Sequence, residues 1–163
     1  MAINALFERL TDQYNHYRSE QVGDPTWAKD NLPFAGELLM GHLRYSTTGK
    51  EGLQYIHPFL RRNNWKSRNL CLCGNFNLTN VDDVTKRLVD KGQHPRDTGD
   101  MFLMLETVGH YLDREVQHEY DALEEAGQQQ IAACIEEQID LVSVLKKASS
   151  DWDGGYTIAG MLG

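Results

Sequence analysis

The 163-residue sequence lacks several features, and each absence excludes a class of protein. It has no apolar run near the ~20 residues that a membrane-spanning helix requires. Its N-terminus, Met-Ala-Ile-Asn-Ala-Leu-Phe-Glu-Arg-Leu, has neither the basic region nor the apolar stretch of a secretory signal. Its three cysteines are too few for a disulfide scaffold and suit a reducing compartment. We therefore expect a cytoplasmic protein without a membrane partner.

Positive charge is also scarce. Lysine and arginine number 16 against 24 aspartates and glutamates, which gives a formal net charge of −8. An acidic chain repels phosphate backbones, so no nucleic-acid partner is expected. The short basic clusters at residues 61–62 and 66–68 are typical of solvated loops.

Metal-ligand spacing is absent as well. Cys71 and Cys73 are separated by one residue, whereas structural zinc sites usually separate paired cysteines by two or more. His110 and His118 lie on expected helices without a third ligand nearby. The sequence therefore predicts no metal site.

Apolar spacing predicts the secondary structure. Steps of three and four residues indicate helices, and short apolar runs bounded by turn residues indicate strands. The expected elements are a helix at 3–20, a loop at 23–33, a strand at 37–45, a hydroxyl-rich loop at 46–52, a strand at 69–73, a tight turn at 74–77, helices at 79–92, 98–112, 115–127 and 131–145, and a strand at 156–162. Strands followed by a block of helices indicate an α+β fold in one domain.

Residues 41–49, Gly-His-Leu-Arg-Tyr-Ser-Thr-Thr-Gly, form the first polar constellation. They place Arg44 at a strand end beside a turn rich in hydroxyl groups such as that of Thr47. A guanidinium pairs with a carboxylate through two parallel hydrogen bonds, and the hydroxyls can complete the coordination of a small acid. The alternative for Arg44 is an ordinary surface ion pair. His42 alternates into the strand and fits a core histidine, and His57 is no better placed for catalysis.

Two further groups follow along the chain. Residues 74–80, Gly-Asn-Phe-Asn-Leu-Thr-Asn, predict a strand, a turn and a helix start. Backbone N–H groups of such a turn and the Asn75 amide can form an oxyanion hole, although a simple capped turn fits the same spacing. Asp100 lies in the first turn of a helix, where it either caps that helix or binds an ammonium group. Arg44, Asn75 and Asp100 together suit an amino-acid ligand.

Five segments, in this order, resemble motifs of class II glutamine amidotransferase domains. The family patterns are Gly-His-x-Arg-Tyr-x-Thr-x-Gly, Gln-Pro-Phe, His-Asn-Gly-Asn-Leu-Thr-Asn, Thr-Ser-Asp and Asp-Gly-Ala-Tyr. The matching segments are residues 41–49, His-Pro-Phe at 57–59, residues 74–80, Thr-Gly-Asp at 98–100 and Asp-Gly-Gly-Tyr at 153–156. One motif alone is weak, whereas five in order are specific. Tyr45 and residues 77–80 favour the amidophosphoribosyltransferase branch of the class.

The resemblance implies a fold and an activity. The fold is that of the N-terminal nucleophile (Ntn) hydrolases, with four αββα layers in which antiparallel sheets pack with helices. The activity is hydrolysis of L-glutamine to glutamate and ammonia, with no cofactor in this domain. In amidophosphoribosyltransferases a second domain uses the ammonia to attack phosphoribosyl diphosphate and start purine synthesis.

The resemblance also implies a role for each site residue. Arg44, helped by Thr47, would bind the α-carboxylate of glutamine, and Asp100 would hold its α-ammonium. Asn75 would supply the oxyanion-hole amide. Phe76 stands where the family has glycine. It keeps the backbone N–H of that position but does not cheaply adopt a glycine-only backbone.

The family nucleophile is an N-terminal cysteine, whereas this sequence begins Met1-Ala2. Cys73 lies near the expected oxyanion turn but has no α-amine to act as its base. The resemblance therefore implies one partial domain over residues 1–163, truncated at both ends and inactive without its nucleophile and its synthase domain. Residues 37–163 would form a piece of the core, while 1–36, a helix and a loop, either belong to the domain or form an insertion.

Two other hypotheses stay open at this point. A stand-alone pseudo-amidotransferase could bind glutamine or a protein partner without catalysis, which would fit the missing cysteine and Phe76. A purely structural module would leave the ordered motifs to coincidence. An open sheet edge would also favour a homo-oligomer.

Overall fold

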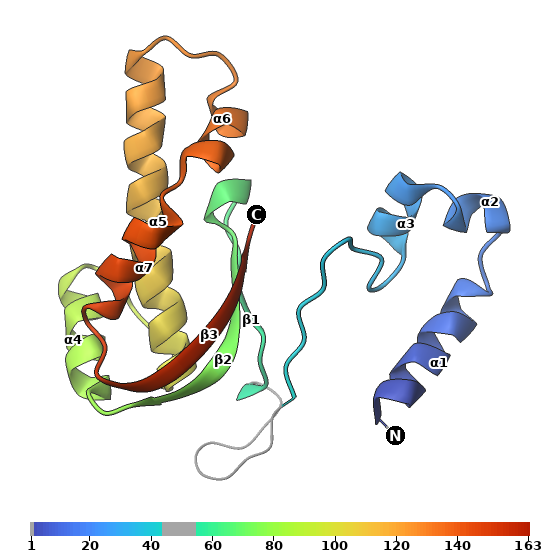
Figure 1. Cartoon of the computed structure of the whole chain (residues 1–163), viewed down its shortest axis with the longest axis horizontal. Helices are drawn as coiled ribbons and strands as arrows, with labels where there is room; N and C mark the ends of the chain where they lie inside the picture. The colour runs from blue at the N-terminus through green and yellow to red at the C-terminus, as the bar shows by residue number, and fades with distance from the viewer. Residues whose placement is uncertain (1, 44–54) are drawn as a thin grey trace. The chain divides into compact units, whose positions relative to one another are not determined.

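The computed structural model describes residues 2–43 and 55–163 of the chain (Figure 1). The chain divides into two compact units, Met1–Met40 and Gly41–Gly163. Arg44 and Thr47 of the expected site, and residues 44–45 of the expected first strand, lie outside the described residues.

The first unit is helical and contains α1 (Ala2–Tyr14), α2 (Ser19–Val22) and α3 (Pro25–Asn31). The helix expected over 3–20 is therefore divided, and the loop expected over 23–33 is wrong because it contains α3. The Asp24 side chain accepts the N–H groups of Thr26 and Trp27 at 2.9 and 3.2 Å, with Pro25 next to it at the helix start. Proline suits this position because its missing N–H would have no partner inside the helix.

The strand expected over residues 37–45 is wrong for its described part, because residues 37–43 form no strand. Leu38, Leu39 and Leu43 are exposed by 69, 59 and 82%. An apolar run becomes a strand where a neighbouring strand pairs with it, and within the described residues this segment has no such neighbour.

The second unit contains an antiparallel sheet in the order β1–β2–β3, formed by β1 (Phe59–Arg61), β2 (Leu70–Leu78) and β3 (Gly154–Leu162). The strands expected at 69–73 and 156–162 are confirmed. The tight turn expected at 74–77 is wrong, because β2 continues through it while paired with β3 from Leu70↔Leu162 to Leu78↔Gly154. Glycine and asparagine suggested a turn, yet a long partner strand stabilises the extended backbone.

Helices cover one face of this sheet (Figure 1). They are α4 (Val81–Asp90), α5 (Asp100–Glu125), α6 (Ile131–Gln138) and α7 (Leu141–Ser149). The helices expected over 98–112 and 115–127 are one continuous helix, and the one expected over 131–145 is divided. Asp140 caps the second part by accepting the Ser143 N–H at 2.9 Å.

The core lies between the sheet and the helices. Its fully buried side chains come mainly from α5, and they include Leu103, Met104, Leu112 and Val116. Leu70, Leu72 and Leu78 join them from β2, because alternate residues of a strand share one face. The described residues thus form a mixed α+β structure, while the four-layer αββα arrangement stays a prediction. Of the helices in the described part of the chain, none is both long and apolar enough to cross a bilayer.

Candidate functional site

Part of β2 is not paired with β1. The pairing of β1 covers only Leu70 to Leu72, so among the described strands the stretch Gly74 to Leu78 has β3 on one side alone. On the other side, the Gly74 N–H donates to His57 Nδ1 at 3.5 Å and the Leu78 N–H donates to Asp100 Oδ2 at 2.9 Å. Alternate N–H groups of a strand point the same way, so the Phe76 N–H points to this side as well. We call these three N–H groups the β2 edge.

Asp100 lies on this edge. It is the first residue of α5, where the positive end of the helix dipole favours a carboxylate. Its Oδ2 atom accepts the Leu78 N–H, which attaches the helix start to the strand. A carboxylate has about four acceptor positions, so Asp100 keeps acceptor capacity for another donor. Asp100 therefore lies on the same edge as the backbone N–H of Phe76.

Phe76 and Asn75 sit in regular strand backbone. The non-glycine residues with positive φ in the described chain are Phe34 and Gln130, so Phe76 does not need a glycine conformation. Its ring lies over Gly74, since a Cβ added there would be 2.5 Å from the ring Cε1 atom. Asn75 is exposed and projects from the opposite face of the strand. The two expected oxyanion donors are thus adjacent, although on a strand rather than a turn.

Two histidines stand beside the β2 edge. The His57 ring lies 5.2 Å from the Phe76 ring, centroid to centroid, and is stacked on His42 at 4.7 Å with an interplanar angle of 29°. The His42 Nδ1 atom is buried with no hydrogen-bond partner in the described chain. His42 belongs to the segment 41–49, so the beginning of that segment lies next to the β2 edge. Sequence reasoning noted His57 in the His-Pro-Phe segment without assigning it a role, whereas the structure places its ring against the β2 edge.

Two of the motif segments from the sequence, at residues 79–80 and 153–156, meet where β2 ends and β3 begins. With Asp151 they form a set of hydrogen bonds that we call the clasp. Thr79 donates to Asp153 twice, from its N–H to the carbonyl at 2.9 Å and from Oγ1 to Oδ2 at 2.7 Å. Asn80 donates from Nδ2 to the Asp151 carbonyl at 3.0 Å and accepts the Asp153 N–H at 3.0 Å. These four hydrogen bonds fix the register of β2 against β3, and with it the position of the β2 edge.

Asp151 also anchors the helices behind the sheet. Its carboxylate accepts from Lys91 Nζ at 2.9 Å and from Arg87 at 2.8 Å, both on or next to α4. Partial burial alone would raise the pKa of Asp151. The hydrogen bonds and positive charges of Lys91 and Arg87 outweigh that effect and hold the pKa below its ordinary value. The group is therefore structural and stays charged near neutral pH.

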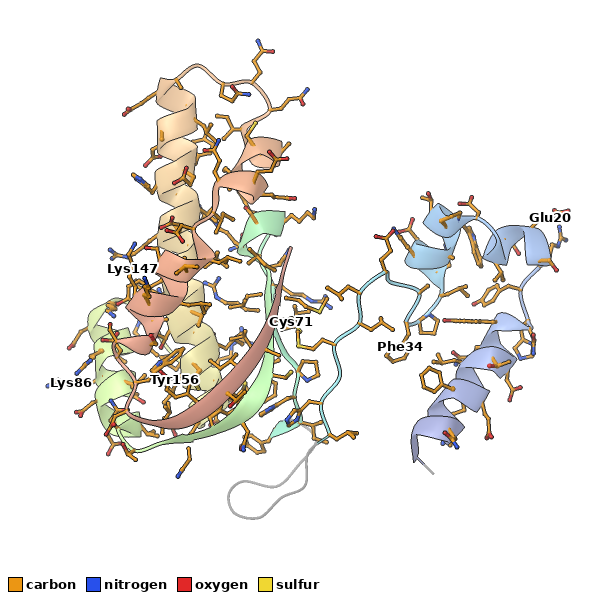
Figure 2. The ribbon with its side chains drawn as sticks, in the orientation of Figure 1. Glu20, Phe34, Cys71, Lys86, Lys147 and Tyr156 are labelled. Carbon is orange, nitrogen blue, oxygen red and sulfur yellow. The ribbon has the colours of Figure 1, made fainter. Side chains whose placement is uncertain are left out.

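The Cys71 thiol is less reactive than a free cysteine. Burial and the neighbouring Cys73 raise the pKa of the Cys71 thiol, so less of the reactive thiolate forms. Figure 2 labels Cys71, which comes from β2. Cys73 itself is 5% exposed. Within the described residues, no three His, Cys, Asp or Glu side chains are grouped to hold a metal ion.

Comparison with known proteins gives an informative similarity. The chain is 34% identical over 102 residues to an amidophosphoribosyltransferase from Lacticaseibacillus casei. The matched region covers 62% of this chain and 50% of that protein, so the chain spans about half the length of the curated relative. No family model matches the sequence. No solved structure matches it either.

Proposed function

We propose that this chain carries the glutamine-recognition part of a class II glutamine amidotransferase of the amidophosphoribosyltransferase type. The observation that carries the proposal is the similarity to the L. casei amidophosphoribosyltransferase. The β2 edge supports it, because an anion and outward backbone N–H groups line one side of a strand. The proposal includes the Ntn hydrolase fold with four αββα layers, of which the described sheet and its helices would form two.

The dimensions of the edge suit glutamine. Successive residues of a strand rise about 3.3 Å, so the N–H groups of Phe76 and Leu78 are about 6.6 Å apart. Five bonds of about 1.5 Å join the α-nitrogen of glutamine to its carboxamide oxygen, an extended length of roughly 6 Å. An α-ammonium held by Asp100 therefore brings the carboxamide within reach of the Phe76 N–H and the Asn75 amide. Arg44 and Thr47 would bind the α-carboxylate.

The proposed reaction is attack of a thiolate on the carboxamide carbon, release of ammonia and hydrolysis of the thioester to glutamate. The oxyanion formed in each step would accept hydrogen bonds from Asn75 Nδ2 and the Phe76 N–H. The raised pKa of Cys71 makes it a poor nucleophile and Cys73 is buried, so we expect the 163-residue chain to bind glutamine without hydrolysing it. In a longer protein with a leading cysteine, the ammonia would pass to a domain that uses phosphoribosyl diphosphate.

The direct test is a titration of the ¹⁵N-labelled chain with L-glutamine, followed by NMR of the backbone amides. We expect saturable shifts at Phe76 and Leu78. Asp100→Asn separates the two roles of the carboxylate, because the amide oxygen still accepts the Leu78 N–H but carries no charge. It should weaken glutamine binding roughly tenfold or more, as lost hydrogen bonds to charged groups usually do.

The matched control is Asp82→Asn, which removes an exposed aspartate from the first turn of α4. It should leave the glutamine affinity unchanged. The proposal fails if glutamine at millimolar concentration shifts no amide of the β2 edge, or if Asp100→Asn and Asp82→Asn have equal effects. Arg44→Ala in a longer, active protein should raise the KM for glutamine, which tests the carboxylate role separately.

A further inference from the structure

We propose that His57 is a positioning residue of this site, and that it holds the β2 edge in its binding geometry only while its imidazole is neutral. The inference rests on the proposed function for its effect on glutamine. It begins from a contact that no motif required, in which the side chain of His57 takes the place of a neighbouring strand. Where β1 stops pairing with β2, His57 Nδ1 accepts the Gly74 N–H at 3.5 Å.

This contact depends on the charge of the ring. A neutral imidazole has one nitrogen that accepts and one that donates, whereas both nitrogens donate in the protonated ring. Nδ1 can accept the Gly74 N–H only in the neutral state, with the proton on Nε2. Protonation places a second N–H opposite that of Gly74, so the contact turns from attraction into repulsion.

Aromatic rings are packed closely around His57, so protonation of its ring affects its neighbours as well. His42 is stacked on one side at 4.7 Å, Phe59 of β1 lies edge-on at 5.2 Å, and Phe76 of β2 lies at 5.2 Å. His42 thus places a second imidazole ring directly against that of His57. Asp100 is an anion on the same edge, where it accepts the Leu78 N–H.

Displacement of His57 would change the position of Phe76, which is part of the proposed oxyanion hole. The Phe76 ring rests on both His57 and Gly74, and the backbone N–H of Phe76 is the proposed donor. When the His57 ring moves, Phe76 loses one of the surfaces that fix it. Glutamine should therefore bind the neutral form and release the protonated form.

The expected change in glutamine affinity follows from the populations of the neutral and protonated forms of His57. The neutral fraction of the His57 imidazole falls as the pH drops through the midpoint of its titration, and well below that midpoint it falls about tenfold for each pH unit. The apparent Kd rises in proportion to the lost fraction of the competent form. Glutamine affinity should therefore fall as the pH is lowered, by up to about tenfold for each pH unit below the midpoint.

The test uses the full ¹⁵N-labelled chain and begins without glutamine. The amide signals of Gly74 and Phe76 are followed from pH 5 to 8, together with the imidazole signals of His57. We expect all three to titrate with one midpoint. His57→Gln provides rescue without titration, because its amide oxygen accepts an N–H at every pH. In that variant the Gly74 signal should stay flat, and the glutamine Kd should be the same at pH 5.5 and 7.5.

Two further variants complete the design. His57→Phe keeps a ring but removes the acceptor, and should weaken glutamine binding at both pH values. His118→Gln removes an exposed histidine of α5 and should keep the wild-type pH profile. Gly74 and Phe76 signals that do not follow His57, or a pH dependence that survives in His57→Gln, would overturn the inference whatever glutamine does. If the amides titrate as expected but glutamine binds at no pH, the proposed function fails instead.

Discussion

Gly74 is the residue on which the geometry of the β2 edge depends most directly, and Gly74→Ala tests this. A Cβ at this position would collide with the Thr157 carbonyl oxygen and stand 2.5 Å from Cε1 and 3.0 Å from Cζ of Phe76. Overpacking of this kind costs about 1–3 kcal/mol. The gain from a less flexible unfolded chain is only about 0.4–1 kcal/mol. The net effect should be a loss of about 1–2 kcal/mol.

The matched control is Gly155→Ala in β3, where an added Cβ meets nothing within 4 Å and φ is not positive. It should be neutral or stabilising by up to about 1 kcal/mol. Thermal unfolding separates the two variants, since 1 kcal/mol corresponds to roughly 2–4 °C in a chain of this size. We expect Gly74→Ala to melt about 2–8 °C below the wild type and to bind glutamine more weakly. A Gly74→Ala protein as stable as Gly155→Ala would refute the close packing of Phe76 on Gly74.

Two further predictions concern stability. Leu112→Ala removes a fully buried side chain of the core and should cost about 2–5 kcal/mol in urea unfolding, whereas Leu141→Ala, at a side chain that is 44% exposed, should change stability by under about 0.5 kcal/mol. The pKa of Asp151 is lowered on folding, so its ion pairs with Lys91 and Arg87 stabilise the protein above the ordinary carboxyl value of 3.8, and that contribution is lost as pH falls through the folded value. Stability measured from pH 6 to 2.5 should thus fall less steeply in Asp151→Asn than in the wild type, and parallel curves would contradict this assignment.

The elements that could be predicted are those whose apolar spacing matches their burial. The helix expected at 98–112 carries Met101, Leu105, Val108 and Leu112 in steps of three and four, and these residues are buried in the core at the start of α5. The errors occurred where local composition and long-range pairing disagree. Gly74 to Asn77 has turn-forming residues, but pairing with β3 makes it a strand. The local sequence cannot indicate that pairing, because the partner strand β3 lies about 80 residues further along the chain.

The candidate site was predictable in its residue types but not in its geometry. Asp100 was expected to cap a helix or bind an ammonium, and the structure shows its carboxylate bound to the Leu78 N–H. His57 was assigned no role in the site because a histidine before a proline carries no pattern of its own. The pairing of β1 with β2 stops at Leu72, so the Gly74 N–H has no strand partner on that side. The side chain of His57 accepts it instead.

The clasp between β2 and β3 has a consequence for the order of folding. Thr79 and Asp153 form their hydrogen bonds across a sequence separation of 74 residues, and all of α4 to α7 lies between them. Closing so long a loop costs more entropy than forming the local contacts of the helices, so the helical layer should form first. The β2 edge would then be among the last parts of the molecule to acquire its structure. A helical intermediate that binds no glutamine is the expected species early in refolding.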